Sequence, residues 1–112
     1  MRYGVKLTPA ALQDAREIAA YIAEHRGRDE AEDFFTSLLD CVDSLASFPD
    51  RGSRPRELMD AGQCGFRQTL LGRYRIVYSV LPGAVSIPLI ADGRRDMQAL
   101  LHARIVSPHA TT

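Results

Sequence analysis

Hydrophobic and polar positions recur with two different periods along the chain, and these periods predict its first elements. Residues 2–7 alternate apolar with small or polar side chains, which is the period of a strand. Residues 9–26 carry apolar side chains every three or four positions, which is the period of a helix. Thr8 can cap the first turn of this helix and Gly27 can end it.

A second helical period follows at once and ends at Phe48, because Pro49 cannot continue a helix. Asp29 and Glu32 form a capping-box-like pair at its start. So short a break between the two helical segments predicts that they fold back on one another as an antiparallel hairpin.

The rest of the chain changes to strand-like patterns. Residues 49–57 combine two prolines, a glycine and three arginines without any period, which predicts a loop. Three strands joined by hairpin turns are then predicted at residues 66–70, 74–81 and 84–91. Asp96 can cap a short final helix.

Together these elements predict one α+β domain over residues 1–106, followed by a flexible tail over residues 107–112. The domain should contain an N-terminal strand, an antiparallel helix hairpin, an antiparallel three-strand meander and a short C-terminal helix.

The strand register can be predicted by asking which pairing collects apolar side chains on one face. A three-residue loop at residues 71–73 sets Phe66 opposite Tyr78, and a two-residue turn at residues 82–83 sets Tyr78 opposite Ile87. The apolar face should cover the helix hairpin. The opposite face is predicted to be too polar for a second core and to meet solvent or a partner, since it carries Arg67, Thr69, Arg75, Ser79 and Ser86.

Pro88 lies within the last of these strands and has no N–H to donate. The strand is therefore expected at a sheet edge or with a bulge at Pro88. An open edge there would accept a strand from a partner.

Composition narrows the classes of function. The 112 residues have a formal net charge of +0, which argues against direct binding of nucleic acid over a broad basic face. Charge is nevertheless uneven, because residues 1–50 carry five basic and ten acidic side chains whereas residues 51–112 carry nine and four. The second half can therefore present a local cationic surface to a phosphate or an acidic partner.

Several kinds of site find no support in the sequence. Cys41 and Cys64 lack the spacing of a zinc or redox site and are expected to be buried, reduced thiols. Gly-rich phosphate loops and nucleophile elbows are absent. No apolar run is long enough to cross a bilayer, so we expect a cytoplasmic protein without metal or cofactor.

Three motifs follow one another along the chain: LASFPDRG at residues 45–52, RYRIVYSV at residues 73–80 and DGRRD at residues 92–96. In this order they resemble motifs of the RelE/ParE toxin family. Residues 45–52, LASFPDRG, are similar to the segment that closes that family's helix hairpin. Residues 73–80, RYRIVYSV, are similar to its Tyr-Arg-Ile-x-Tyr strand. Residues 92–96, DGRRD, are similar to its His-Gly-Arg-Arg-Asp turn, with Asp92 where the family often has His. The resemblance covers residues 7–105.

This resemblance implies a toxin of a type II toxin–antitoxin system that forms a hetero-oligomer with a ParD-like antitoxin encoded beside it. ParE-like members inhibit DNA gyrase by binding, whereas RelE-like members are ribosome-dependent mRNA endonucleases. A non-catalytic interaction module or an inactive toxin is a third interpretation.

Cleavage of RNA needs a base, an acid and cations around the phosphate. Arg67 and Arg75, which share the polar face in the predicted register, could supply the cations. Proton-transfer groups are less evident, because the tyrosines of the predicted strands point to the core. His102 and His109 are the remaining candidates if the protein is an RNase.

Arg67, Arg75, Arg94 and Arg95 are also the candidates for binding an antitoxin or target. The alternative for the last two is a structural salt bridge to the acidic helix that carries Asp40 and Asp43. We favour a ParE-like toxin that acts by binding, with no catalytic residue, and expect Arg75→Ala to weaken partner binding while leaving the fold intact.

Overall fold

The structure is a computed structural model that describes residues 2–108. Its first elements are a strand and a hairpin of two long helices. They are β1 (Gly4–Leu7), α1 (Pro9–Arg26) and α2 (Arg28–Ser47). The Thr8 hydroxyl accepts a hydrogen bond from the Ala11 N–H at 3.1 Å, as the capping prediction requires. The prediction that Asp29 and Glu32 cap α2 is wrong, because Gly27 both ends α1 and precedes α2, which leaves Asp29 inside the first turn.

Seven further elements complete the chain. They are η1 (Pro49–Arg51), α3 (Arg56–Asp60), β2 (Phe66–Leu71), β3 (Tyr74–Leu81), β4 (Ala84–Asp92), α4 (Met97–Leu101) and the π-helical turn η2 (His102–Val106). The Asp96 carboxylate caps α4 by accepting from the Ala99 N–H at 3.1 Å. The short helix α3 was predicted as loop up to Glu57.

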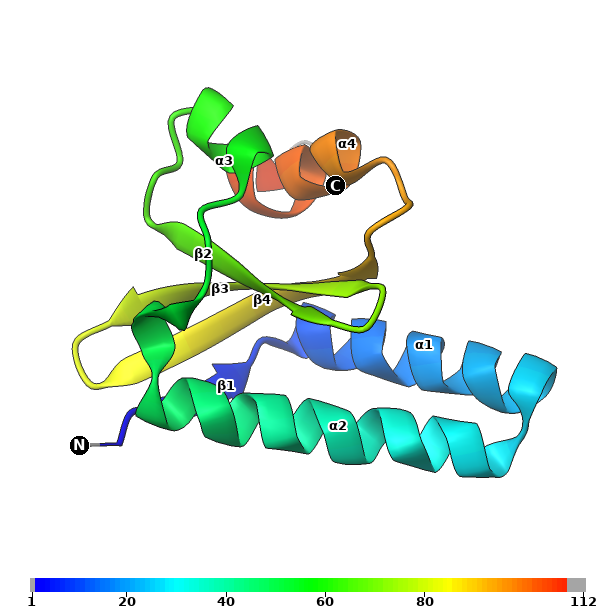
Figure 1. Cartoon of the computed structure of the whole chain (residues 1–112). Helices are drawn as coiled ribbons and strands as arrows, with labels where there is room; N and C mark the ends of the chain where they lie inside the picture. The colour runs from blue at the N-terminus through cyan, green and yellow to red at the C-terminus, as the bar shows by residue number, and fades with distance from the viewer. Residues whose placement is uncertain (1, 109–112) are drawn as a thin grey trace.

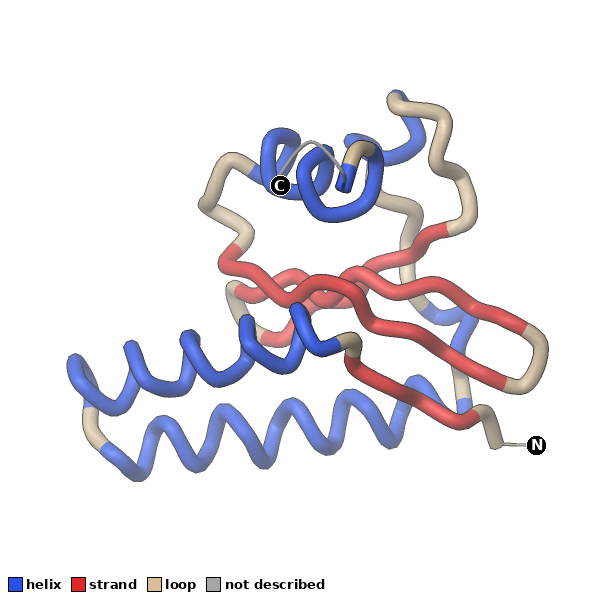
Figure 2. The backbone as a smooth tube through the Cα atoms, turned by 180° about the vertical axis from the view of Figure 1, so that it is seen from behind, coloured by secondary structure: helices blue, strands red, loops and turns tan. Residues whose placement is uncertain are grey.

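The sheet lies between two layers of helix. Figures 1 and 2 show the α1–α2 hairpin along one face of the sheet and α3, α4 and η2 over the other. The predicted strand, helix hairpin, meander and short helix are confirmed. The layer formed by α3, α4 and η2 over the second face of the sheet was not predicted.

Strand order in the sheet is β1-β4-β3-β2, with β1 parallel to β4 and the other pairs antiparallel. β4 is therefore an internal strand, and the prediction that it lies at a sheet edge is wrong. The alternative prediction of a bulge is confirmed, because the β3–β4 register shifts between Val77 and Ser79. Ile87 and Pro88 together then lie opposite Tyr78.

The predicted β2–β3 register is wrong by one residue. Leu71 pairs with Tyr74, and Arg67 rather than Phe66 lies opposite Tyr78. The turn has two residues instead of three because Gly72, with φ of 58°, adopts the left-handed conformation that a tight hairpin needs. A slip of one residue moves every side chain of β2 to the other face.

The sheet has a core on each face, which corrects the prediction of one apolar and one polar face. The bulge changes the alternation along β4, so that Val85, Ile87 and Ile90 face the helix hairpin while Leu89 and Ala91 face α4. The core under the hairpin also includes Ala11, Ala15, Ala19, Ile22, Ala31, Phe34, Leu38, Leu45, Ile76 and Tyr78. The second core consists of Leu58, Val77, Leu89, Ala91, Met97 and Leu101.

The chain passes from one layer to the other at Gly52. Its N–H donates to the hydroxyl of the buried Tyr78 at 3.0 Å. A Cβ at Gly52 would lie 2.5 Å from that hydroxyl oxygen and closer still to the Gln68 carbonyl. Ser53 then pairs with Gln68 of β2 through two backbone hydrogen bonds of 3.1 and 2.7 Å. Only glycine fits between the helix hairpin and the edge of the sheet.

A polar clasp holds η2 beside β4 where β1 has ended. The Asp14 carboxylate accepts from the Ile90 N–H at 3.0 Å and from both terminal nitrogens of Arg104 at 2.8 and 3.1 Å. Arg104 also donates to the Pro88 carbonyl at 2.9 Å. The clasp satisfies backbone groups of β4 that β1 does not reach.

The cysteines match their prediction only in part. Cys41 is half-buried, and burial raises the pKa of its thiol, whereas Cys64 is exposed. Both are free thiols.

We expect Gly52→Ala to lower the free energy of unfolding by about 2–3 kcal/mol, because the added methyl overlaps backbone and the Tyr78 hydroxyl. Gly65→Ala is the matched control: nothing lies within 4 Å of its Cβ, so its effect should stay within about 0.5 kcal/mol. Urea denaturation measures both. Equal stability of the two variants would contradict the steric role of Gly52.

Candidate functional site

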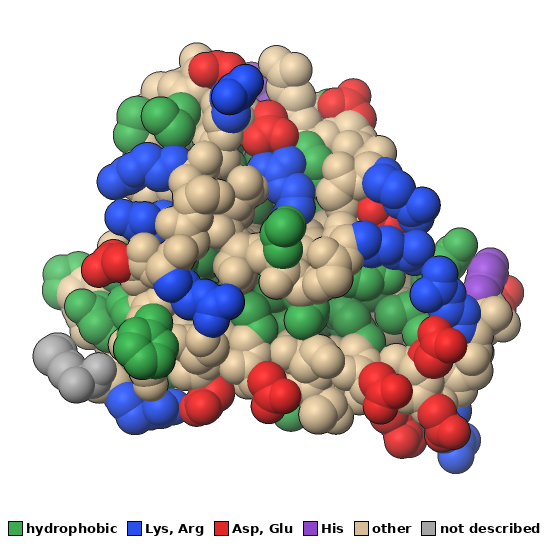
Figure 3. Space-filling model, in the orientation of Figure 1, with side chains coloured by type: hydrophobic (Ala, Val, Ile, Leu, Met, Phe, Trp, Pro, Cys, Tyr) green, Lys and Arg blue, Asp and Glu red, His purple; other side chains and the backbone are tan. Residues whose placement is uncertain are grey.

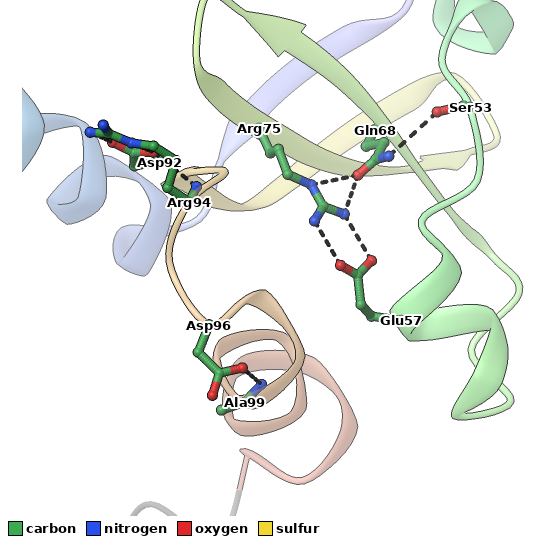
Figure 4. A network of polar contacts seen from close by, with 8 residues as sticks. All are labelled: Ser53, Glu57, Gln68, Arg75, Asp92, Arg94, Asp96 and Ala99. Carbon is green, nitrogen blue, oxygen red and sulfur yellow. Dashed lines mark hydrogen bonds and ion pairs between the residues drawn. The ribbon is translucent and has the colours of Figure 1, made fainter.

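A network of polar contacts connects α3 to the sheet on the face away from the helix hairpin (Figure 4). The Arg75 guanidinium donates to the two Glu57 oxygens at 2.8 and 2.9 Å. Its Nε donates to the Gln68 Oε1 at 2.8 Å, and its Nη2 donates to the same oxygen. We call Glu57, Gln68 and Arg75 the α3 clamp, because it holds α3 against β2 and β3.

The α3 clamp leaves Arg75 little freedom to bind a ligand. Its side chain is 13% exposed, and all three guanidinium nitrogens donate within the protein. The hydrogen bonds from Arg75 lower the pKa of Glu57 to about 2, so the pair stays charged at neutral pH. Arg75→Ala is thus expected to loosen α3, contrary to the sequence-based expectation of an intact fold.

Arg67 lies on the opposite face of the sheet from Arg75, so the predicted pair does not converge. The β2–β3 register places Arg67 beside Tyr78, under the helix hairpin. Its Nη1 donates to the backbone carbonyls of Asp50 and Gly52 at 3.2 and 2.8 Å. Arg67 therefore stabilises the crossing at Gly52, and the two arginines cannot hold one phosphate between them.

Arg94 and Arg95 emerge at the end of β4 and differ in their contacts. Arg94 donates to Asp92 through its backbone N–H and its guanidinium at 2.9, 3.2 and 3.0 Å. These bonds lower the pKa of Asp92 and raise that of Arg94. Arg95 is exposed, and its guanidinium has no partner among the described residues.

The alternative that Arg94 and Arg95 pair with acidic residues of α2 is wrong. Asp43 instead binds Arg2, with 2.5 Å between Nη2 and Oδ1. Arg94 has a nearer carboxylate within its own turn, at Asp92. Local geometry thus determines its partner.

A hollow beside these arginines runs along one side of α1. We call it the α1–β4 groove; its volume is about 300 Å³ and it is lined by Asp14, Glu17, Ile18, Tyr21, Arg73, Tyr74, Ile90, Ala91, Asp92, Arg94 and Arg95. Arg73 contacts Asp92 at 3.2 Å and lies over the Tyr74 ring, 5.4 Å from its centroid. Tyr21 is 53% exposed and stacks on His25, with 4.1 Å between ring centroids. The groove combines buried apolar side chains with charged side chains of both signs.

A second open groove lies between α2 and the β2–β3 turn. Figure 3 shows a band of hydrophobic side chains between α2 and the strands, with Asp and Glu side chains gathered along α2. Phe34, Leu71 and Tyr74 line this groove together with charged side chains, among them Glu30 and Asp33. Outside the groove lining, Phe35 and Leu39 of α2 are exposed at 38% and 67%. These two exposed side chains suit an apolar partner.

The possible proton-transfer groups Tyr78 and His102 lie on opposite faces of the sheet. Tyr78 is fully buried, and burial raises the pKa of its hydroxyl. His102 is exposed at the start of η2, where it lines a hollow of about 110 Å³ with Glu57 and Asp60. His109 lies outside the described residues. The carboxylates beside His102 would repel a phosphate.

The family of the chain follows from comparison with known proteins. The family model of the ParE toxin of the type II toxin–antitoxin system parDE matches residues 5–97. The chain belongs to this ParE toxin family. No curated protein sequence matches it.

Two solved structures have the same fold as this ParE-family chain. One, from the chromosomal ParDE TA system of P. aeruginosa, has a TM-score of 0.68 and 20% identity, and the match covers 81% of this chain and 96% of that one. The other, from the toxin–antitoxin complex RelBE2 of Mycobacterium tuberculosis, has a TM-score of 0.60 and 19% identity, with 82% and 99% covered. The RelE/ParE resemblance and the α+β fold are thus confirmed.

Other kinds of site are not formed by the described part of this ParE-family chain. Within residues 2–108, no three His, Cys, Asp or Glu side chains are grouped so that they could hold a metal ion. The helices of that part are all too short or too polar to cross a membrane.

Sequence reasoning missed several residues of these ParE-family surfaces. Glu57 falls in the segment predicted as a loop, although Pro55 before the segment RELMD is compatible with a short helix. Tyr21 belongs to none of the three motifs, and Arg73 stands just before the Tyr-Arg-Ile-x-Tyr match. They meet Arg94 only because β4 returns beside α1.

We expect Glu57→Gln to lower the free energy of unfolding by about 1–2 kcal/mol near neutral pH. The folded-state pKa of Glu57, about 2, lies below its ordinary value of 4.5. The contribution is therefore complete above the unfolded-state pKa and is lost as pH falls through the folded-state pKa. Urea denaturation across this pH range measures it.

Asp60→Asn, in the same helix and exposed, is the matched control for Glu57→Gln. It should change stability by no more than about 0.5 kcal/mol. A loss from Glu57→Gln that stays constant as the solution is acidified would contradict the clamp.

Proposed function

We propose that this ParE-family chain is a cytoplasmic toxin that inhibits DNA gyrase by binding and is neutralised by a ParD-like antitoxin. The observation that carries the proposal is the separation of the two arginines expected to clamp a phosphate. Arg67 and Arg75 lie on opposite faces of the sheet, and each binds groups of the protein itself.

An RNase would need a base and an acid beside a cationic phosphate site. Tyr78 is held by the Gly52 N–H in the core, and His102 lies among carboxylates. Neither Tyr78 nor His102 therefore lies beside an arginine that is free to bind a phosphate. Binding without chemistry requires none of these groups, which favours the ParE-like activity.

The surface for the antitoxin is proposed on α2, through the exposed side chains of Phe35 and Leu39 and the groove between α2 and the β2–β3 turn. Phe35 and Leu39 are one helical turn apart, which matches the spacing of apolar side chains on an amphipathic helix. Glu30 and Asp33 border the same groove and would attract a basic residue of that helix. The solved ParDE and RelBE2 structures are toxin–antitoxin systems, which supports a partner of this kind.

Arg94 and Arg95 are the proposed partner-binding cations of the site. Both are exposed at the end of β4, unlike Arg67 and Arg75. We assign structural roles to Arg67 and Arg75 instead. Arg67 donates to the Gly52 carbonyl, and Arg75 donates to Glu57 in the α3 clamp.

Purified protein titrated into a gyrase supercoiling reaction is expected to inhibit it, while leaving mRNA intact in a ribosome-programmed cleavage assay. Addition of the protein encoded by the adjacent reading frame should restore supercoiling. Leu39→Glu should raise the antitoxin concentration needed for this rescue at least about tenfold, because it places a charge on the exposed apolar surface of α2 that the antitoxin would cover.

Thr36→Glu, an exposed position on the same helix, is the control for Leu39→Glu and adds the same charge. Cleaved mRNA with normal supercoiling would replace the proposal by a RelE-like activity, and His102→Ala would then be the first variant to test.

A further inference from the structure

The α1–β4 groove has the apolar lining and the small volume of a pocket that binds a single side chain of a partner. Ile18, Ile90 and Ala91 form its floor, and Tyr21 and Tyr74 stand at its sides. About 300 Å³ is at the lower limit of ligand pockets, so the groove has room for one or two side chains rather than for a large cofactor.

Some charged side chains of this groove have an oppositely charged partner and others have none. Asp14 is bound by Arg104, and Asp92 is bound by both Arg94 and Arg73. Within residues 2–108, Glu17 accepts a hydrogen bond only from the side-chain amide of Gln13. Arg95 is left without a partner among the described residues, at the rim of the groove. A cation is therefore available to an anionic group that enters beside Asp92.

Its acidic members argue against nucleic acid as the occupant. The successive phosphates of a nucleic acid backbone would be repelled by Glu17, Asp14 and Asp92, which all line this groove. A single carboxylate on an apolar or aromatic stretch avoids them, because it can meet Arg95 while its neighbour covers Tyr21. The groove therefore fits a protein segment.

We infer that the α1–β4 groove binds an acidic side chain and an adjacent apolar or aromatic side chain from the antitoxin. The inference rests on the antitoxin binding proposed above and adds a second anchor to it. The first anchor is the α2 surface with Phe35 and Leu39, which gives affinity by burial, whereas the second distinguishes antitoxins by the position of one charge. Tyr74 lines both grooves, so one antitoxin chain can reach from one to the other.

The test uses the antitoxin from the adjacent reading frame, with the dissociation constant of its complex measured by calorimetry. Arg95→Glu is expected to weaken binding about tenfold or more, and Tyr21→Ser by a similar factor. Arg28→Glu is the matched control, because it makes the same charge change at an exposed position outside the groove. It should change affinity no more than about twofold.

A second readout separates contact from general electrostatics. Arg95 is exposed, so thermal unfolding of Arg95→Glu should match that of the control. Raising the salt concentration should weaken the unaltered complex more than the Arg95→Glu complex, because the variant has lost a charge contact that salt screens. In spectra of the labelled toxin, the backbone amide of Asp92 should shift on binding in the unaltered protein but less in Arg95→Glu.

Affinities of Arg95→Glu and Tyr21→Ser equal to that of Arg28→Glu would overturn the inference and leave the proposed antitoxin binding in place. Failure of the unaltered chain to bind the adjacent protein would overturn both. Loss of affinity for a single-stranded RNA oligonucleotide in Arg95→Glu, with antitoxin affinity unchanged, would assign the groove to nucleic acid and would also overturn it.

Discussion

The contact between Gly52 and the hydroxyl of Tyr78 is the constraint on which the two-sided architecture depends. Tyr78 is buried under the helix hairpin, yet its hydroxyl reaches the edge of the sheet and binds the segment that leaves α2. A glycine is required there because a Cβ would overlap that hydroxyl and the Gln68 carbonyl. The chain can then pass to the far face, where Glu57 meets Arg75 and α3 closes over the second core.

The bulge at Pro88 has an equally wide effect, because it changes the face to which β4 directs its side chains. Before the bulge Ile87 packs under the helix hairpin, and after it Leu89 packs under α4. A regular strand would have presented Leu89 to the same side as Ile87. Where β1 has ended, Asp14 accepts from the Ile90 N–H and Arg104 donates to the Pro88 carbonyl, so β4 backbone groups without a neighbouring strand are hydrogen-bonded. The bulge thus serves both cores, and the bond to Arg104 positions η2 beside β4.

Arginine has two distinct uses in this ParE-family chain. Arg67, Arg75 and Arg104 are partly buried and bind carbonyls or carboxylates that connect separate elements. Arg94 and Arg95 lie exposed beside the α1–β4 groove, where charge can act on a partner. Composition cannot distinguish these uses, since a guanidinium has the same charge in a structural network as on a binding surface.

The sequence by itself determined the order of the longer helices and strands, the helix hairpin, the cap at Thr8 and the family suggested by three motifs, and it limited Pro88 to a sheet edge or a bulge. These follow from local periods, caps and glycine or proline positions. The tertiary structure alone decided for the bulge at Pro88, and it decided the β2–β3 register, the second core and the separation of Arg67 from Arg75. The physical reason is that the local pattern at residues 71–73 fits a turn of two or of three residues, and so two registers. Only one of them lets Phe66 pack on the far face against Leu58, Met97 and Leu101.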